Sequence, residues 1–184
     1  MVPRINRVRT DAAKEWLTQS INDLKKPVDN VADFVAQTKY LLTINEEFQN
    51  YRDKIDLYGN FHSILASDGT KKITKEDKDR QMMASKQIAD LSQIVQECES
   101  SQEAQNERFK KDLEKLIPKL HGEVATLHEE SIDPKFMSES SNMYEMIEDL
   151  DKKWVAFKEF ETRSETYNQW QETLMTPSTM FDNI

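Results

Sequence analysis

The sequence is poor in the two residues that most often interrupt helices. Its 184 residues include only three glycines and five prolines, far below the usage of a fold that mixes strands, tight turns and helices. A phosphate-binding loop and a dinucleotide-binding turn both need closely spaced glycines, and the chain has none of that spacing. The scarcity of both residues favours an all-α protein.

Cysteine and long apolar runs are also scarce. Cys98 is the only cysteine, so no disulfide can form within the chain, and a lone thiol fits a reducing compartment. No apolar run approaches the roughly 18 to 20 residues that cross a bilayer, and the N-terminus lacks the apolar segment of a secretory signal. We therefore expect a soluble, intracellular protein.

Positive charge is in deficit. The 25 Lys and Arg residues stand against 34 Asp and Glu, which gives a net charge of −9 and repels nucleic acid phosphates and anionic lipid headgroups. Arg4, Arg7 and Arg9 make the first turns basic. Because no aromatic residues alternate with them, this pattern indicates a solvated helix face and not a nucleic-acid-binding surface. We expect neither nucleic acid nor a membrane as a partner.

What the chain has instead is a continuous apolar pattern over residues 31–65. Two positions repeat through five heptads, and eight of the ten places are apolar or aromatic. The first position holds Phe34, Leu41, Phe48, Ile55 and His62, and the second holds Gln37, Ile44, Tyr51, Tyr58 and Leu65. Polar residues fill the intervals, which predicts one long helix with a single buried seam.

Three further helices are predicted, over about 4–25, 74–131 and 139–175. Asn30 or Asp29 is expected to cap the seam helix, and Thr74 with Asp77 resembles a capping box. Asp68-Gly69 and Ile132-Asp133-Pro134 provide the turns between helices.

The long helix over 74–131 carries two apolar stripes. They are separated by the polar stretch 99–108, so the helix either crosses a gap between two packing surfaces there or bulges away from the bundle. Pro118 predicts a kink but not an end, because the stripe continues in phase on both sides of it. The members of the stripes are Ala84, Ile88, Leu91, Val95 and Cys98, then Phe109, Leu113, Leu116, Leu120, Val124 and Leu127.

The last helix carries Met143, Ile147, Leu150, Trp154 and Phe157 in heptad spacing, after which the stripe shifts to Phe160, Tyr167, Trp170 and Leu174. Such a shift lets one helix contact two different neighbours along its length.

The lengths predict an elongated, antiparallel helical bundle of three long helices with a shorter N-terminal helix. At 1.5 Å per residue the helices over 31–65 and 139–175 are about 50 Å long, against about 85 Å for 74–131. We divide the chain into an N-terminal helix at 1–27, a long-helix bundle at 28–176 and a connection at 177–184. Trp16, Trp170 and Phe181 lack an obvious internal partner, which suggests a piece of a longer rod.

The histidines, the cysteine and the paired carboxylates are not spaced to form a catalytic or metal-binding site. His121 and His128 lie about 10.5 Å apart along a helix, too far to hold one metal ion, and His62 is expected to be a satisfied interior imidazole. Cys98 is expected to be a small core residue. For Met82 and Met83, core filling is favoured over the alternative that they flank a sticky surface. Glu129-Glu130 and Glu148-Asp149 are adjacent pairs that point to different faces, and Gly69-Thr70-Lys71-Lys72 lacks phosphate-loop spacing. We expect no catalytic, cofactor or metal site.

Several of these patterns together resemble one family. The resemblance rests on four features: a helix with Tyr58 that closes on Ile64-Leu65, a helix led by Phe109 and continuing through Leu113 to Leu116, the Ile132–Pro134 loop, and the run from Trp154 to Thr162 before TPSTMF. In these features the chain resembles the tail of an axonemal dynein heavy chain, in the region that leads into the linker. The resemblance covers residues 28–184.

This resemblance implies a non-catalytic part of a microtubule motor that transmits force between the tail base and the linker. It implies contacts with other heavy chains and with intermediate or light chains, in the axoneme of a cilium or flagellum. The ATP sites and the microtubule-binding tip of the family would lie downstream, so the resemblance assigns no site residue here.

Two other classes stay open. A spectrin-like or plakin-like scaffold also has three antiparallel helices, although it should repeat regularly and no internal repeat is found. A coiled-coil adaptor would dimerise in parallel, which the loops at 66–74 and 132–138 disfavour. An enzyme is the least favoured class.

Overall fold

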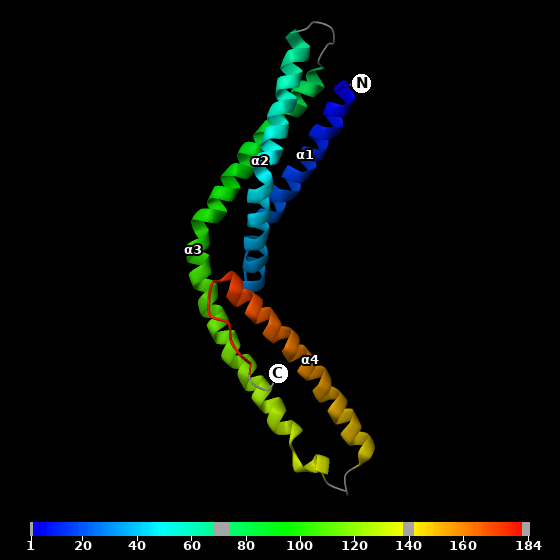
Figure 1. Ribbon diagram of the computed structural model, residues 1–184, viewed down its shortest axis with the longest axis vertical. Helices are drawn as coiled ribbons and strands as arrows, with labels where there is room; N and C mark the ends of the chain where they lie inside the picture. Colours follow the sequence, from blue (N-terminus) through cyan, green and yellow to red (C-terminus); the bar gives the residue numbers. More distant parts are fainter. Residues whose placement is uncertain (1, 68–73, 138–141, 182–184) are drawn as a thin grey trace. The chain divides into compact units, whose positions relative to one another are not determined.

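The computed structural model is all-α, as predicted, and describes residues 2–67, 74–137 and 142–181. Its four α-helices are α1 (Val2–Leu24), α2 (Val31–Ser67), α3 (Lys75–Ser131) and α4 (Met143–Thr173), with a short 3-10 helix, η1 (Pro134–Met137), before α4 (Figure 1). Within those described ranges there is no β-strand. The predicted bundle of helices is confirmed, with ends that shift by only a few residues.

The helix starts follow the local sequence. Asn30 caps α2, since its Oδ1 accepts a hydrogen bond of 3.0 Å from the N–H of Asp33. Thr74 and Asp77 form the predicted capping box: the Asp77 N–H donates to Thr74 Oγ1 at 3.2 Å, and the Thr74 N–H donates to Asp77 Oδ2 at 3.3 Å. Asn142 caps α4 in the same way, through the N–H of Tyr144. Each cap satisfies an N–H that the helix itself leaves unpaired.

Packing divides the chain into two compact units. One comprises Met1–Asp29 with Ala36–Glu103, and the other comprises Asn30–Val35 with Ala104–Ile184. The boundary on α3 falls between Glu103 and Ala104, inside the polar stretch 99–108, where α3 passes from one set of packing partners to another. No residue of that stretch is buried.

This division differs from the one based on sequence, which placed boundaries after residues 27 and 176. The chain divides within α3 because α3 is too long for one partner. It has 57 residues, against 37 in α2 and 31 in α4, so neither helix can pair with it from end to end. The N-terminal helix packs with α2 and the first half of α3 as a member of the first unit.

In the first unit α1 runs antiparallel to α2, and α2 runs antiparallel to the first half of α3 (Figure 1). The predicted α2 seam is buried at Leu41, Ile44, Ile55 and Tyr58, whereas its last member, Leu65, lies outside the side chains that the structure describes. From α1, Trp16 stacks on Tyr51 with 3.9 Å between ring centroids. The core of this unit consists of Ala13, Leu17, Leu24, Leu41, Ile44, Ile55, Ala84, Leu91 and Ile94.

In the second unit α4 runs antiparallel to the second half of α3, and the segment after α4 turns back beside α3 (Figure 1). Phe34, from the first turn of α2, stacks on Phe109 with 5.1 Å between centroids. Pro118 lies inside α3 and the helix continues through it, as predicted. The buried apolar residues are Val31, Phe34, Val35, Phe109, Leu113, Leu120, Val124, Tyr167 and Leu174.

Three aromatic residues that lacked a partner in the sequence have one in the fold. Besides Trp16 on Tyr51, the ring of Phe181 meets His121 edge-on at 4.8 Å and Trp170 lies 5.3 Å from Tyr167. The inference of a longer rod from these residues was therefore wrong in its premise. Sequence separation hid the partners of Trp16 and Phe181.

An ion pair joins α1 to α3 in the first unit. The guanidinium of Arg7 donates to both carboxylate oxygens of Asp77, at 2.6 and 2.9 Å, while Asp77 also belongs to the capping box. The Asp77 side chain is only 8% exposed. Hydrogen bonds from Arg7 and Thr74 outweigh this burial and hold the pKa of Asp77 well below its usual range.

We predict that Asp77→Ala lowers the free energy of unfolding of the chain by about 1–2 kcal/mol, because the substitution removes both a cap and an ion-pair acceptor. Since its folded pKa is lowered, the contribution of Asp77 is fully present above pH ~4 and is lost as the pH falls further. Denaturant titrations between pH 7 and pH 2 measure both effects. Asp79→Ala, an exposed change two residues along, is the control, and an equal loss there would contradict the prediction.

We also predict that amides of residues 99–108 and around Pro118 exchange with solvent faster than those of 34–65. The polar stretch has no buried side chain to oppose local opening, and Pro118 removes one helix hydrogen bond. Hydrogen exchange read by mass spectrometry measures the difference. Equal protection in all three segments would contradict it.

Candidate interaction surface

The predicted apolar stripe on the first half of α4 is present, but it is not covered. Met143, Ile147, Leu150 and Trp154 are between 47% and 70% exposed. Tyr144 and Val155 lie beside them and are more than half exposed. Large apolar side chains gathered on one exposed face mark an interaction site in soluble proteins.

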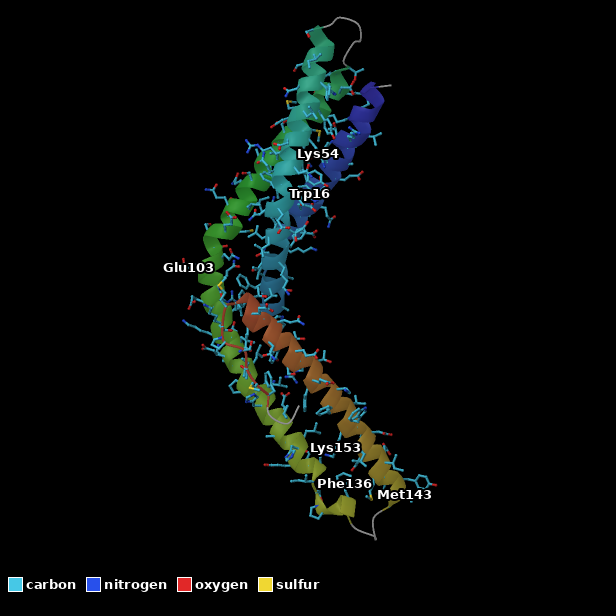
Figure 2. The ribbon with its side chains drawn as sticks, viewed as in Figure 1. Trp16, Lys54, Glu103, Phe136, Met143 and Lys153 are labelled. Carbon is cyan, nitrogen blue, oxygen red and sulfur yellow. The ribbon has the colours of Figure 1, made fainter. Side chains whose placement is uncertain are left out.

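An apolar groove of about 330 Å³ runs beside this stripe, between the last turns of α3 and residues 150–160 of α4. Lys153 reaches from α4 toward α3, where it meets Glu130 (Figure 2). Met143, the first residue of the stripe, lies at the start of α4. The groove is lined by Val124, Leu127, His128, Ser131, Leu150, Lys153, Trp154, Phe157 and Phe160.

Two ion pairs hold α3 and α4 together along this groove. The Lys153 ammonium lies 2.8 Å from a carboxylate oxygen of Glu130, and Arg163 donates to Glu123 at 2.5 Å. Lys153 is only 14% exposed, since its stem lies against the groove wall and its charged end meets Glu130. The pairs fix the spacing of the two helices without covering their apolar side chains.

Aromatic contacts arrange the groove rim. Trp154 and Phe157 stack with 5.7 Å between centroids, and the Lys158 ammonium lies 5.1 Å from the centre of the Trp154 ring. A cation over an indole face is favourable even at an exposed site. Trp154 is therefore held in place while most of its surface faces solvent.

The stripe is exposed because, among the described residues, only the two α-helices α3 and α4 pack together at this end of the second unit. In the first unit α1 covers the α2–α3 seam, and near Phe109 the start of α2 covers α3. Between Val124 on α3 and Ser164 on α4, none of the described residues is buried. Two helices alone cannot enclose a seam on every side.

A second, more polar groove lies in the first unit, between the end of α2 and the start of α3. Gly59 lets Gln81 come close there, because a Cβ at Gly59 would meet the Gln81 amide nitrogen at 3.0 Å. That nitrogen donates to the carbonyl of Ile55. The groove is lined by Asp56, Gly59, Asn60, His62, Ser63, Lys78, Gln81, Met82 and Ser85.

Three residues of this region differ from their sequence-based interpretation. Met82 and Met83 do not fill the core but are 66% and 55% exposed, because their side chains lie outside the face of α3 on which Ala84 is buried. His62 is half-buried, and its Nδ1 has no hydrogen-bond partner, so it is not the satisfied interior imidazole that was expected. The Gly69–Lys72 segment lies outside the described residues.

The remaining candidates are dispersed. His121 contacts Phe181, His128 lines the apolar groove, and Cys98 is half-buried against the core of the first unit. Burial raises the pKa of the Cys98 thiol, which keeps it protonated near neutral pH. Over the described ranges, no three His, Cys, Asp or Glu side chains converge as metal ligands. Nor is any helix of those ranges long and apolar enough to cross a membrane.

No protein-family model matches the chain, and a search of curated proteins finds no match. Function is therefore inferred from the residues and from the surfaces that they form. Among those surfaces, the exposed α4 stripe with its groove has the largest apolar side chains.

We predict that Trp154→Ala changes the free energy of unfolding of the dilute chain by less than about 1 kcal/mol, whereas Phe109→Ala lowers it by about 3–5 kcal/mol. Trp154 is largely exposed and Phe109 is fully buried. Denaturant unfolding measures both. Trp154→Ala should also weaken binding of a dye that reports apolar surface, and Leu42→Ala, with a similarly exposed side chain, should not. A loss of several kcal/mol in Trp154→Ala would show that the stripe belongs to the core.

Proposed function

We propose that the chain is a non-catalytic structural segment of the tail of an axonemal dynein heavy chain, in the region that leads into the linker. The order of helical patterns over residues 28–184 supports this, together with one structural observation: an apolar α4 stripe that the chain itself leaves uncovered. A self-contained globular protein has little use for such a stripe. A segment that packs against further subunits does.

The proposed role is mechanical. The first unit has a close-packed core in which Leu17, Ile44, Ile55 and Leu91 are fully buried, and close-packed side chains yield little under load. The helices would carry force between the tail base and the linker. The α4 stripe would offer a surface to other heavy chains, intermediate chains or light chains.

In this proposal the segment acts in the cytoskeleton, within the axoneme of a cilium or flagellum, and needs no cofactor of its own. ATP hydrolysis and microtubule binding belong to other parts of the parent chain. The net charge of −9 favours protein partners over nucleic acids or anionic membranes.

A spectrin-like helical scaffold is the second candidate, with a coiled-coil adaptor behind it. The observation in favour of the scaffold is the first unit, whose three helices run alternately antiparallel around one core (Figure 1). The scaffold requires that the same arrangement recur at a regular period along the parent chain.

We predict that the native polypeptide carrying this stretch is a giant chain with several G-x-x-x-x-G-K-[ST] motifs downstream of Ile184. Such motifs are expected because a motor binds nucleotide in phosphate loops of this kind. Mass determination of the purified protein and peptide sequencing test this. A short chain, or one that continues in regular helical repeats without nucleotide motifs, would exclude the dynein proposal and favour a scaffold.

A further inference from the structure

The segment that follows α4 forms a strap over residues 175–181. It leaves the end of α4, turns back beside α3 and belongs to the second unit (Figure 1). Leu174, the residue before the strap, is fully buried, whereas no residue of the strap is. A segment without buried side chains has little apolar packing to oppose local opening. The attachment of the strap therefore depends on specific hydrogen bonds and ring contacts.

Two amide side chains of α4 hold the strap at Thr179. The Nε2 group of Gln171 donates to Thr179 Oγ1 at 2.8 Å, and the Thr179 N–H donates to Gln171 Oε1 at 2.9 Å. The same N–H also donates to Asn168 Oδ1 at 3.3 Å. Gln171 is only 4% exposed, and the strap satisfies both polar groups of its side chain, as burial of an amide requires. We call these hydrogen bonds of Gln171 and Asn168 to Thr179 the latch.

An aromatic contact attaches the far end of the strap to α3. The ring of Phe181 meets the imidazole of His121 edge-on, with 4.8 Å between centroids, which is a favourable geometry for two rings. The latch and this ring contact thus fix the strap to both long helices of the second unit.

The first residue of the strap has a strained backbone. Met175 has a φ of 55°, and within the described ranges it is the only residue other than glycine with a positive φ. The Thr176 N–H bonds to the carbonyl of Gln171 at 2.9 Å, and the Met175 N–H bonds to that of Glu172 at 3.2 Å. A helix that ends with this pair of bonds usually has glycine where Met175 stands. The Cβ of methionine is crowded in that conformation, so Met175 disfavours the closed position of the strap.

We infer that the strap opens as one unit about Met175, while α4 remains helical. Strain at Met175 opposes the latch and the ring contact, so the closed strap is less stable than its contacts alone would make it. Opening separates Gln171 and Asn168 from Thr179 and separates His121 from Phe181. The strap thereby controls whether these three side chains are available to another protein segment. The inference uses only the second unit and does not depend on the proposed function.

Amide hydrogen exchange of the full 184-residue chain, followed residue by residue by NMR, tests for this opening. The amides of Thr176 and Thr179 should have similar protection factors, because one opening exposes both. Both factors should be at least roughly tenfold lower than that of Leu174, whose N–H bonds to the carbonyl of Trp170 at the end of α4.

Two variants change the balance in opposite directions. Met175→Gly should slow exchange at Thr176 and Thr179 by roughly three- to tenfold, because glycine adopts a positive φ without steric cost. Gln171→Met keeps the length of the side chain but removes the polar groups of the latch, and should speed exchange at both amides by roughly tenfold or more. Gln169→Met, the same change at an exposed position of α4, is the matched control and should leave both amides unchanged. Circular dichroism checks that each variant remains helical.

Phe181→Ala tests whether the strap moves as one unit. Loss of the ring contact with His121 weakens the closed state as a whole, so exchange should become faster at Thr176 as well as at Thr179, by roughly threefold or more. If the contacts of the strap broke one at a time, Thr176 would be unaffected, because its N–H bonds to α4 and lies five positions before Phe181.

Equal protection at Thr176, Thr179 and Leu174 would show that the strap does not open separately from α4, and would overturn the inference. Exchange that Met175→Gly leaves unchanged, or that Phe181→Ala changes at Thr179 alone, would overturn it too. None of these results bears on the length of the parent polypeptide or its downstream motifs, so the proposed function stands or falls separately.

Discussion

The length of α3 is the constraint on which the rest of the structure depends. At 57 residues it extends for roughly 85 Å, and neither α2 nor α4 is long enough to accompany it throughout. Its apolar residues accordingly form two stripes with a polar stretch between them. The first stripe completes a core with α1 and α2, and the second pairs with α4. Because no described helix plays the part of α1 beside α4, the shared face of α3 and α4 is open to solvent within the described residues.

Local features of the fold could be predicted from the sequence because short-range chemistry determines them. Asn30 and the Thr74–Asp77 pair cap their helices through contacts three residues apart, and Pro118 sits within a stripe that stays in phase across it. The α2 seam was predictable for the same reason, since heptad spacing directly reflects which side of a helix is apolar.

Contacts between distant segments were not predictable. Arg7 and Asp77 are separated by 70 positions, and nothing near Trp16 indicates that Tyr51 will stack on it. The exposed α4 surface could not be predicted from the sequence for a different reason. Heptad spacing at Met143, Ile147, Leu150 and Trp154 states that a helix has one apolar face, but it does not state whether the chain supplies a cover for that face. The number and arrangement of the helices decide that, and only the three-dimensional structure contains them.

The three tryptophans occupy environments that differ optically. Trp16 is half-buried and stacked on Tyr51, Trp170 is half-buried beside Tyr167, and Trp154 faces solvent on the α4 stripe. An indole in water emits at longer wavelength than one enclosed by apolar side chains, so the red part of the emission belongs mainly to Trp154. The chain thus carries its own reporter at the surface of interest: whatever covers the stripe shifts that emission to the blue, and no label has to be attached to see it.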